Sequence, residues 1–351
     1  MSPTSKLAFP ALRPGRAATP IAFIRAIVLA YRRYGVAPAG ALARAGIDAA
    51  LLEQPDARVT AAQMEIISGH AMQELDDEAL GWFSRRLPWG SYGMLCRASL
   101  GAPNLGVALK RWCRHHRLLT DDIGLALDVA KTAATLTVAP RRPLGEMQEF
   151  CLVTLLRYVL GYACWAIDSR IPLTESRFPF PAPPHADAYS LMFPGPVRFD
   201  AEFAGLSFDA RYLELPIRRD EAALQTMLQR ALPLTVLQYR RDRLLVEGVR
   251  RFLRDPASAP ATAETVAEHL HVSVRTLHRQ LHEEGSSLQR LKDDARRDRA
   301  IELLNRSSRS IKQISALVGF GNEKSFSRAF RTWTGVPPQT FREKGLGDKR
   351  A

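Results

Sequence analysis

The pattern of hydrophobic and polar positions is most regular in the C-terminal third of this 351-residue chain, where one arrangement occurs twice. In the segments 262–285 and 310–335, apolar residues recur at the three- and four-residue spacing of amphipathic helices. Each segment predicts two short helices joined by a tight turn, a helix-turn-helix unit. Equivalent positions are 48 residues apart before the turn and 49 after it, so the second turn is one residue longer.

The second helix of each unit, the recognition helix, has two contrasting faces. An α-helix advances about 100° per residue, so Leu277 and Leu281 share one face, as do Phe326 and Phe330 in the second unit. The opposite faces carry Arg275, Arg279, His282, Lys324, Arg328 and Arg331. A helix with an apolar back and a basic front fits the major groove of DNA, where arginine can donate two hydrogen bonds to guanine.

These faces and the helix ends predict two sets of DNA contacts. The side chains expected to contact bases are Arg275, His278, Arg279, Lys324, Ser327 and Arg328. Those expected to contact the DNA backbone are Thr262, Ser273, His282, Ser310, Asn322, Ser325 and Arg331. Glu323, which opens the second recognition helix, either accepts from cytosine N4 or stabilises the helix N-terminus.

Polar residues and glycines mark the ends of these helices. The favoured N-cap residues are Thr262, Ser273, Ser310 and Asn322. Ser310 with Gln313, and Ser286 with Gln289, have capping-box spacing, while Gly285 and Gly335 suit the left-handed position that ends a helix. Between the units, 287–305 predicts one linker helix, whose apolar positions are Leu288, Leu291, Ala295, Ala300, Ile301 and Leu304. That helix would set the distance between the recognition helices.

The first two thirds of the chain mix helical and strand patterns. Helical periodicity covers 22–34, 61–74, 104–118 and 145–167. Alternating segments at 125–129 and 134–138 predict a β-hairpin, and further strands are expected at 176–180, 197–199 and 205–208. The predicted organisation is a tail (1–18), an α+β domain (19–215), a linker (216–238) and an all-α domain (239–345) that opens with a helix at 240–254.

Charge is distributed unevenly along the chain. The net charge is +13, and residues 230–351 hold 24 Lys and Arg against 14 Asp and Glu, a net +10. The excess accompanies the helix-turn-helix units, as phosphate binding requires. The four cysteines lack a Cys-x-x-Cys pair, which predicts reduced, buried thiols in a cytoplasmic protein. No apolar run approaches the ~20 residues of a membrane span, and the N-terminus lacks a signal-peptide core.

Few residues of the N-terminal domain suggest chemistry. His115 and His116 would point about 100° apart on a helix, so no metal site is expected. No Ser/His/Asp set, carboxylate pair or phosphate loop has a local signature, so neither catalysis nor a cofactor is expected. Two choices stay open. The arginines either form a solvated face or anchor a carboxylate ligand: Arg111, Arg114 and Arg117. Nearby side chains either line a pocket or fill the core: Trp112, Cys113 and His115.

The C-terminal segment resembles the DNA-binding domain of the AraC/XylS family of bacterial transcription regulators. The resemblance rests on the first-unit core, the Gly319–Phe320 turn, the SFSRAF run (325–330) and the closing GVPPQTFR (335–342). Ser315 stands where that family usually has alanine. Residues 20–215, chiefly 90–119 and 177–200, resemble the arabinose-binding-like N-terminal domain of one AraC-type subfamily.

The resemblance implies a ligand-responsive regulator that binds promoter DNA and activates nearby metabolic genes. The N-terminal domain would sense a small-molecule effector and mediate homodimerisation, and the C-terminal domain would recruit RNA polymerase. The expected effector site is a mainly apolar cavity between the strand-rich region 125–208 and a neighbouring helix, unless the aromatic residues only fill a core: Trp82, Trp89, Trp112 and Trp165. Two alternatives for the whole protein are an enzyme tethered to DNA and an architectural DNA-binding protein without a ligand.

Overall fold

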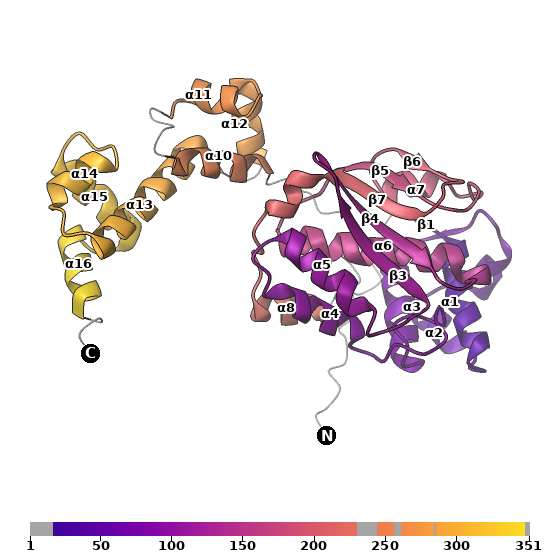
Figure 1. The fold of residues 1–351 in the computed structure, drawn as a ribbon. Coiled ribbons are helices and arrows are strands. Elements are labelled where there is room, and N and C mark those ends of the chain that lie inside the picture. The colour runs from indigo at the N-terminus through magenta and orange to yellow at the C-terminus, as the bar shows by residue number, and fades with distance from the viewer. Residues whose placement is uncertain (1–16, 230–243, 256–260, 284–285, 348–351) are drawn as a thin grey trace. The chain divides into compact units, whose positions relative to one another are not determined.

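The chain forms two compact units, Met1–Asp242 and Arg243–Ala351, shown in Figure 1. The computed structural model describes residues 17–229, 244–255, 261–283 and 286–347. The N-terminal unit combines helices with a sheet, and the described part of the C-terminal unit is helical. This confirms the predicted fold class of an α+β domain followed by a helical one.

A five-stranded sheet forms one layer of the N-terminal unit (Figure 1). Its strands lie in the order β3 (Ile123–Val129), β4 (Ala133–Pro140), β7 (Ala204–Asp209), β5 (Leu173–Arg177) and β6 (Val197–Arg198). The β5–β6 pair is parallel and the other pairs are antiparallel. Val129 pairs with Ala134, which confirms the predicted hairpin. Strands β1 (Thr19–Pro20) and β2 (Arg58–Val59) form a separate pair.

Strand β5 lies three residues earlier than the expected 176–180. The chain leaves the sheet after Arg177 because the next aromatic side chains join a cluster around helix α7 (Asp187–Met192). The rings of Phe178 and Phe180 lie 4.9 and 6.4 Å from the ring of Tyr189. Alternating apolar residues suit both a strand and this cluster, so the pattern alone misplaced the strand.

Four helices of this unit have nearly the predicted ends: α1 (Ile21–Arg33), α3 (Ala61–Glu74), α5 (Leu105–His116) and α6 (Gln148–Ala166). Other short elements were not predicted: α2 (Ala39–Arg44), α4 (Ser91–Leu100), α7, α8 (Glu221–Leu228) and the 3₁₀ turns η1 (Ala49–Glu53) and η3 (Ala210–Glu214). The helix expected at 145–167 begins with a 3₁₀ turn, η2 (Gly145–Met147). The start of α4 shows why. The Glu78 carboxylate accepts from the backbone N–H groups of Gly90 and Tyr92 at 2.8 and 2.6 Å. A contact across the intervening loop therefore defines this helix start.

Helix α6 is the core helix of the N-terminal unit, and it contacts β4 and β7. Together with η2 it spans Gly145–Ala166 and is long and apolar enough to cross a membrane, which corrects the expectation that no run approaches that length. Its apolar window is 83% buried inside the unit, as is typical of a core helix. Arg157 interrupts the window; it donates to the Met192 carbonyl at 2.5 Å, and burial lowers its pKa to about 10.

The stretch expected to be a linker, 216–238, includes a packed helix. Helix α8 lies against α4, where Arg97 pairs with Glu221 at 2.7 Å and the side chain of Leu228 approaches Gly93. The N-terminal unit therefore extends at least to the end of α8, beyond the expected limit at 215. Residues 230–243 lie outside the described ranges.

The C-terminal unit contains the two predicted helix-turn-helix units and the linker helix. The described helices are α10 (Leu244–Arg254), α11 (Ala263–His269), α12 (Val274–Glu283), α13 (Leu288–Arg306), α14 (Ile311–Leu317), α15 (Glu323–Thr334) and α16 (Pro338–Gly347). The first four residues of the helix expected at 240–254 lie outside the described ranges. Helix α16 was not predicted, and its Phe341 ring packs 5.5 Å from the Phe330 ring.

The linker helix α13 belongs to two hydrophobic cores. Its first half contributes Leu288 and Leu291 to a core shared with α10, α11 and α12. Its second half contributes Ala300, Leu303 and Leu304 to a core shared with α14 and α15. One helix is thus packed into both helix-turn-helix units, which fixes each recognition helix to the same rigid element.

Candidate DNA-binding interface and effector pocket

The recognition helices α12 and α15 are held by their apolar faces. Leu277 and Leu281 of α12, and Phe326 and Phe330 of α15, are fully buried. Complete burial of two side chains on one face leaves the opposite face of each helix turned to solvent. This arrangement confirms the apolar back that the sequence predicts for both helices.

The side chains expected to contact bases lie on the solvent face of these helices. Five of them are exposed and Ser327 is half-buried: Arg275, His278, Arg279, Lys324 and Arg328. His282, Ser325 and Arg331, expected to contact the DNA backbone, are exposed as well. The arrangement is compatible with groove readout, and whether these side chains contact DNA stays a prediction.

Four residues expected to contact the DNA backbone also cap helices. Thr262 and Ser310 form capping boxes with Thr265 and Gln313, and the Ser273 hydroxyl accepts from the Thr276 N–H at 3.1 Å. The Asn322 side-chain oxygen accepts from the Ser325 N–H at 2.8 Å. The cap uses only the oxygen of the Asn322 side chain, so the amide NH₂ group can donate to a phosphate while the cap stays in place.

The two turns share a left-handed residue, and only in the second turn is this residue a glycine, which favours that conformation. Gly319 has φ of 83° and His271, 48 positions earlier, has φ of 53°. The following N–H groups, of Phe320 and Val272, bond to Ser315 and Ala267 carbonyls, which completes a Schellman motif in each unit. The extra residue of the second turn is therefore Gly321, which comes after the motif.

Two other helix ends can be compared with the predictions. Gly335 ends α15 with φ of 81°, as predicted. The cap of α13 is Ser287, whose side chain accepts from the Arg290 N–H, and not the expected Ser286 with Gln289. Neighbouring serines give the same local signal, and the register of the helix on its core decides which one caps it. Gly285 lies outside the described residues.

An acidic side chain accompanies the first recognition helix. The pKa of Glu264 is lowered, first by the backbone N–H at the start of α11, then by the Thr262 hydroxyl and by the charges of His278 and Lys292. Glu264 therefore stays ionised beside His278.

A surface hollow of about 230 Å³ lies between α5 and β3 in the N-terminal unit. It is lined by Lys110, Cys113, Arg114, Arg117, Leu125 and Leu127. Its position, between a strand and a neighbouring helix, is the one expected for an effector cavity. Its character differs from the mainly apolar cavity that was expected, because three cationic side chains surround a small apolar floor.

The hollow groups the basic residues on α5 differently from the three arginines that the sequence singles out. Lys110, Arg114 and Arg117 follow a spacing of four and three residues and share one stripe of the helix, whereas Arg111 lies about 100° away. The structure brings the first three together and leaves Arg111 outside the lining. The spacing of Lys110, Arg114 and Arg117 is visible in the sequence, beside that of the three arginines.

Of the remaining candidates on α5, Trp112 and His116 belong to the core and His115 is half-buried. Trp112 and His116 are 2% exposed, and burial lowers the pKa of His116 to about 4, so this imidazole is neutral. Three of the four N-terminal tryptophans are buried, and Trp89 is 40% exposed. The four cysteines are free and buried, as predicted. Within the described ranges, no three His, Cys, Asp or Glu side chains gather as metal ligands would.

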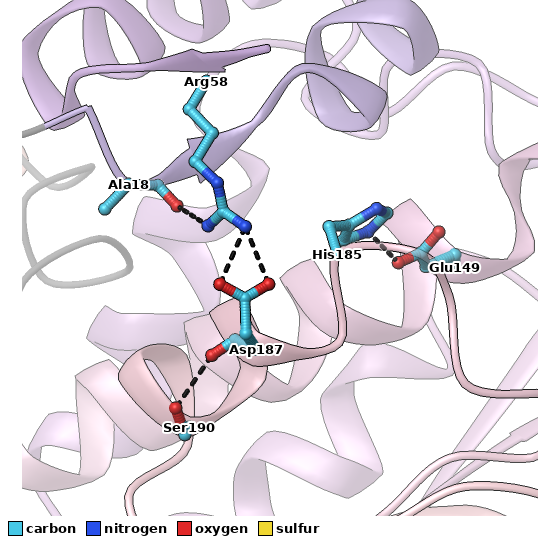
Figure 2. A network of polar contacts seen from close by, with 6 residues as sticks. All are labelled: Ala18, Arg58, Glu149, His185, Asp187 and Ser190. Atoms are coloured by element: carbon cyan, nitrogen blue, oxygen red, sulfur yellow. Dashed lines mark hydrogen bonds and ion pairs between the residues drawn. The ribbon is translucent and has the colours of Figure 1, made fainter. Parts of the chain in front are cut away.

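Figure 2 shows a polar network that fixes α7 to neighbouring elements. The Arg58 guanidinium on β2 donates to both carboxylate oxygens of Asp187, at 2.7 and 2.8 Å, and this contact lowers the pKa of Asp187. Nearby, His185 Nε2 lies 2.8 Å from the Glu149 carboxylate on α6, which also accepts from the Tyr189 hydroxyl. These contacts have a structural role, because each of them joins α7, or the segment that leads into it, to β2 or α6.

Two family models match this chain. The arabinose-binding domain of AraC transcription regulators, N-terminal part, matches residues 35–217. A helix-turn-helix domain matches residues 266–344. The first model covers more than half of the chain and includes α5, β3 and the hollow between them. The second covers both recognition helices.

Known proteins are similar over either the whole chain or its C-terminal part. The ornithine utilization regulator of Pseudomonas aeruginosa is 28% identical over 326 residues, 92% of this chain and 96% of that protein. The HTH-type transcriptional regulator VqsM of the same species is 41% identical over 78 residues, 22% of this chain and 24% of that protein. The HTH-type transcriptional activator RhaS of Salmonella arizonae is 36% identical over 93 residues, 26% and 34% of the two chains.

A solved structure, the transcriptional regulator CdpR from Pseudomonas aeruginosa, aligns with 95% of this chain and 100% of its own at 21% identity and a TM-score of 0.31. The family is established by the two matching models and the near full-length relative, which agree with the repeated helix-turn-helix units. The chain therefore belongs to the AraC family of transcription regulators, as a DNA-binding regulator with an arabinose-binding-type N-terminal domain and a helix-turn-helix C-terminal domain.

Proposed function

We propose that this regulator binds promoter DNA through α12 and α15 and activates nearby metabolic genes when its N-terminal unit binds a small molecule. The observation that carries the proposal is the pair of recognition helices, each with a buried apolar back and an exposed basic front. Two such helices packed on one linker helix suit successive major-groove segments, which are about 34 Å apart along the DNA.

In this proposal, Arg275, His278 and Arg279 contact bases in one groove segment, and three residues of α15 do so in the next: Lys324, Ser327 and Arg328. The phosphates are contacted by the capping residues and by exposed side chains at the edges of the helices: Thr262, Ser273, His282, Ser310, Asn322, Ser325 and Arg331. The capping geometry supports this division, because helix N-termini attract phosphate through their backbone N–H groups.

The direct test is a binding series on the promoter of the adjacent gene and on random DNA. Arg279→Ala and Arg328→Ala should each weaken specific binding by about 1–3 kcal/mol and relax the base preference at one position. Arg299→Ala is the matched control, since Arg299 lies on α13 and pairs with Glu302. An equal loss on random DNA would reduce both arginines to phosphate contacts.

The proposed partners beyond DNA are a second copy of the chain, RNA polymerase and the effector, and the proposed compartment is the cytoplasm. The size of the N-terminal unit and its arabinose-binding-type match support effector sensing. Because the near full-length relative is named an ornithine utilization regulator, ornithine is the first compound to test. An effector should change promoter affinity by roughly 1–3 kcal/mol.

An enzyme tethered to DNA is the competing function, and the similar proteins named above are regulators without exception. The two functions differ in one measurement. A regulator needs only the promoter and its effector to change transcription in a purified system with RNA polymerase. Effector turnover in the same mixture would favour the enzyme.

A further inference from the structure

The hollow between α5 and β3 has an unusual concentration of positive charge for a site with an apolar floor. Lys110 and Arg114 are one helical turn apart, and Arg117 continues the same stripe. All three are exposed. Leu125 and Leu127 come from β3, on the same face of the strand, and Cys113 completes the lining.

These cations lack the carboxylate partner that several other basic residues of the unit have. Arg97, Arg142 and Arg219 pair with Glu221, Asp122 and Asp168 at 2.6–2.9 Å. Across the described residues, neither a hydrogen bond nor an ion pair engages the side chains of Lys110, Arg114 or Arg117.

A carboxylate, that of Asp128, also lies near this stripe, as its effect on Cys113 shows. The charges of Arg117 and Asp128 act on that thiol in opposite directions, while its burial raises the pKa to about 11. The thiol is thus uncharged and adds nothing to the charge of the lining. The site retains a net positive charge with Asp128 included.

We propose that this hollow binds a small organic anion, with a carboxylate or phosphate headgroup held by Lys110, Arg114 and Arg117 and a short apolar part placed on Leu125 and Leu127. The inference rests on the proposed function, for which it supplies the effector site and the chemical class of the effector. It disfavours sugars, which lack a charge for the three cations, and compounds of net positive charge, which these cations repel. Ornithine is such a compound at neutral pH, so specific binding of ornithine at this hollow would contradict the inference.

The size and shape of the hollow favour a small molecule over a nucleic acid. A volume of about 230 Å³ lies just below the roughly 300–1,000 Å³ of common ligand pockets. The apolar floor would gain nothing from a phosphate backbone, but it stabilises a short hydrocarbon part. Arginine pairs with carboxylate or phosphate in a bidentate geometry, which orients the headgroup toward α5.

The experiment is calorimetric titration of the full-length protein with a matched set of probes. These are butyrate, hexanoate, n-butyl phosphate and inorganic phosphate, with butyramide and butylamine as uncharged and cationic probes of the same length. The anions should bind and the amide and amine should not. Hexanoate should bind more tightly than butyrate by about two- to fourfold per added methylene. The order of butyrate and butyl phosphate identifies the headgroup.

The variants locate the site. Arg114→Gln and Arg117→Gln together should weaken anion binding by at least about tenfold, because each removes a charged hydrogen-bond donor. Arg111→Gln is the matched control, one residue from Lys110 on the same helix but outside the lining. Circular dichroism of each variant checks that the unit is folded.

Several results would overturn the proposal. Equal affinity for butyrate and butyramide would remove the role of charge, and an equal loss in Arg111→Gln would remove the role of this stripe. Binding of none of the anions would also reject the site. Promoter binding measured on the same preparation separates the two proposals, because a protein that binds its promoter but no anion keeps the regulator function and loses only this effector site.

Discussion

Replacing Gly319 by alanine tests whether the left-handed turn before α15 positions the second recognition helix. Gly319 has φ of 83°, a conformation that costs a residue with a side chain about 1–2 kcal/mol. The added methyl group would lie 3.9 Å from the guanidinium nitrogens of Arg296, an ordinary contact. The cost is therefore conformational and not steric.

Gly321, two residues later, is the matched control. It lacks the left-handed backbone, and a methyl group added there would meet no described atom within 4 Å. Both substitutions restrict the unfolded chain to the same extent, a stabilising effect of roughly 0.4–1 kcal/mol that cancels in the comparison. Gly319→Ala should thus be less stable than Gly321→Ala by about 1–2 kcal/mol, the cost of the left-handed conformation alone.

The measurement is hydrogen exchange by mass spectrometry on the full-length protein, followed in peptides from α14 and α15. Local opening free energies in these helices should fall in Gly319→Ala and hold or rise in Gly321→Ala. Promoter affinity should follow the same order, because α15 carries half of the proposed base contacts. Equal protection in the two variants would show that the turn tolerates a side chain and that the Schellman geometry contributes nothing specific.

Three further predictions concern DNA binding, domain independence and pH. The promoter affinities of Arg279→Ala and Arg328→Ala should decrease with added salt as steeply as that of the unmodified protein, as base contacts require. A shallower slope in either variant would show that the arginine contacts a phosphate. A fragment beginning at residue 237 should fold and bind DNA weakly by itself, and limited proteolysis that yields no stable C-terminal piece would contradict this. Burial lowers the pKa of His116 from 6.5 to about 4. Between these two pH values the imidazole is protonated in the unfolded chain but stays neutral in the folded unit, so up to about 3 kcal/mol of folding stability is lost as the pH falls from 6.5 to 4. Burial raises the pKa of Glu78 to about 7, so this carboxyl group makes the folded unit more stable as the pH falls from 7 to 4.5. The contribution of His116 is therefore measured as the difference in pH-dependent stability between the unmodified protein and His116→Leu, by denaturation from pH 6.5 to 4.

Much of the C-terminal unit could be predicted from the sequence because its structure is encoded over short distances. The apolar positions of Leu277, Leu281, Phe326 and Phe330 repeat with the helical period, and each of them is buried. The caps at Thr262 and Ser310 use side chains three residues away. Local spacing of this kind determines where a helix begins and which face it buries. It does not reveal that His271 takes the same left-handed conformation as Gly319, since that depends on the Schellman bonds around it.

The N-terminal unit depended more on tertiary structure, because its elements are positioned by residues far apart in the chain. Periodicity placed α1, α3, α5 and α6, and alternation placed the β3–β4 hairpin. It could not place α4, whose start is held by Glu78, or show that α8 packs on α4 through the Arg97–Glu221 pair.

The sequence by itself determined the family, the repeated helix-turn-helix units and the basic faces of the recognition helices, because all three depend on the spacing of residues that are close together in the chain. Only the tertiary structure decided the character of the hollow between α5 and β3. The sequence shows cations along α5, but β3 must lie beside that helix before Lys110, Arg114 and Arg117 surround a floor of Leu125 and Leu127. Charge spacing defines a stripe on a helix, whereas a binding site needs a second wall, and that wall is supplied by a strand whose position depends on the folding of the whole sheet.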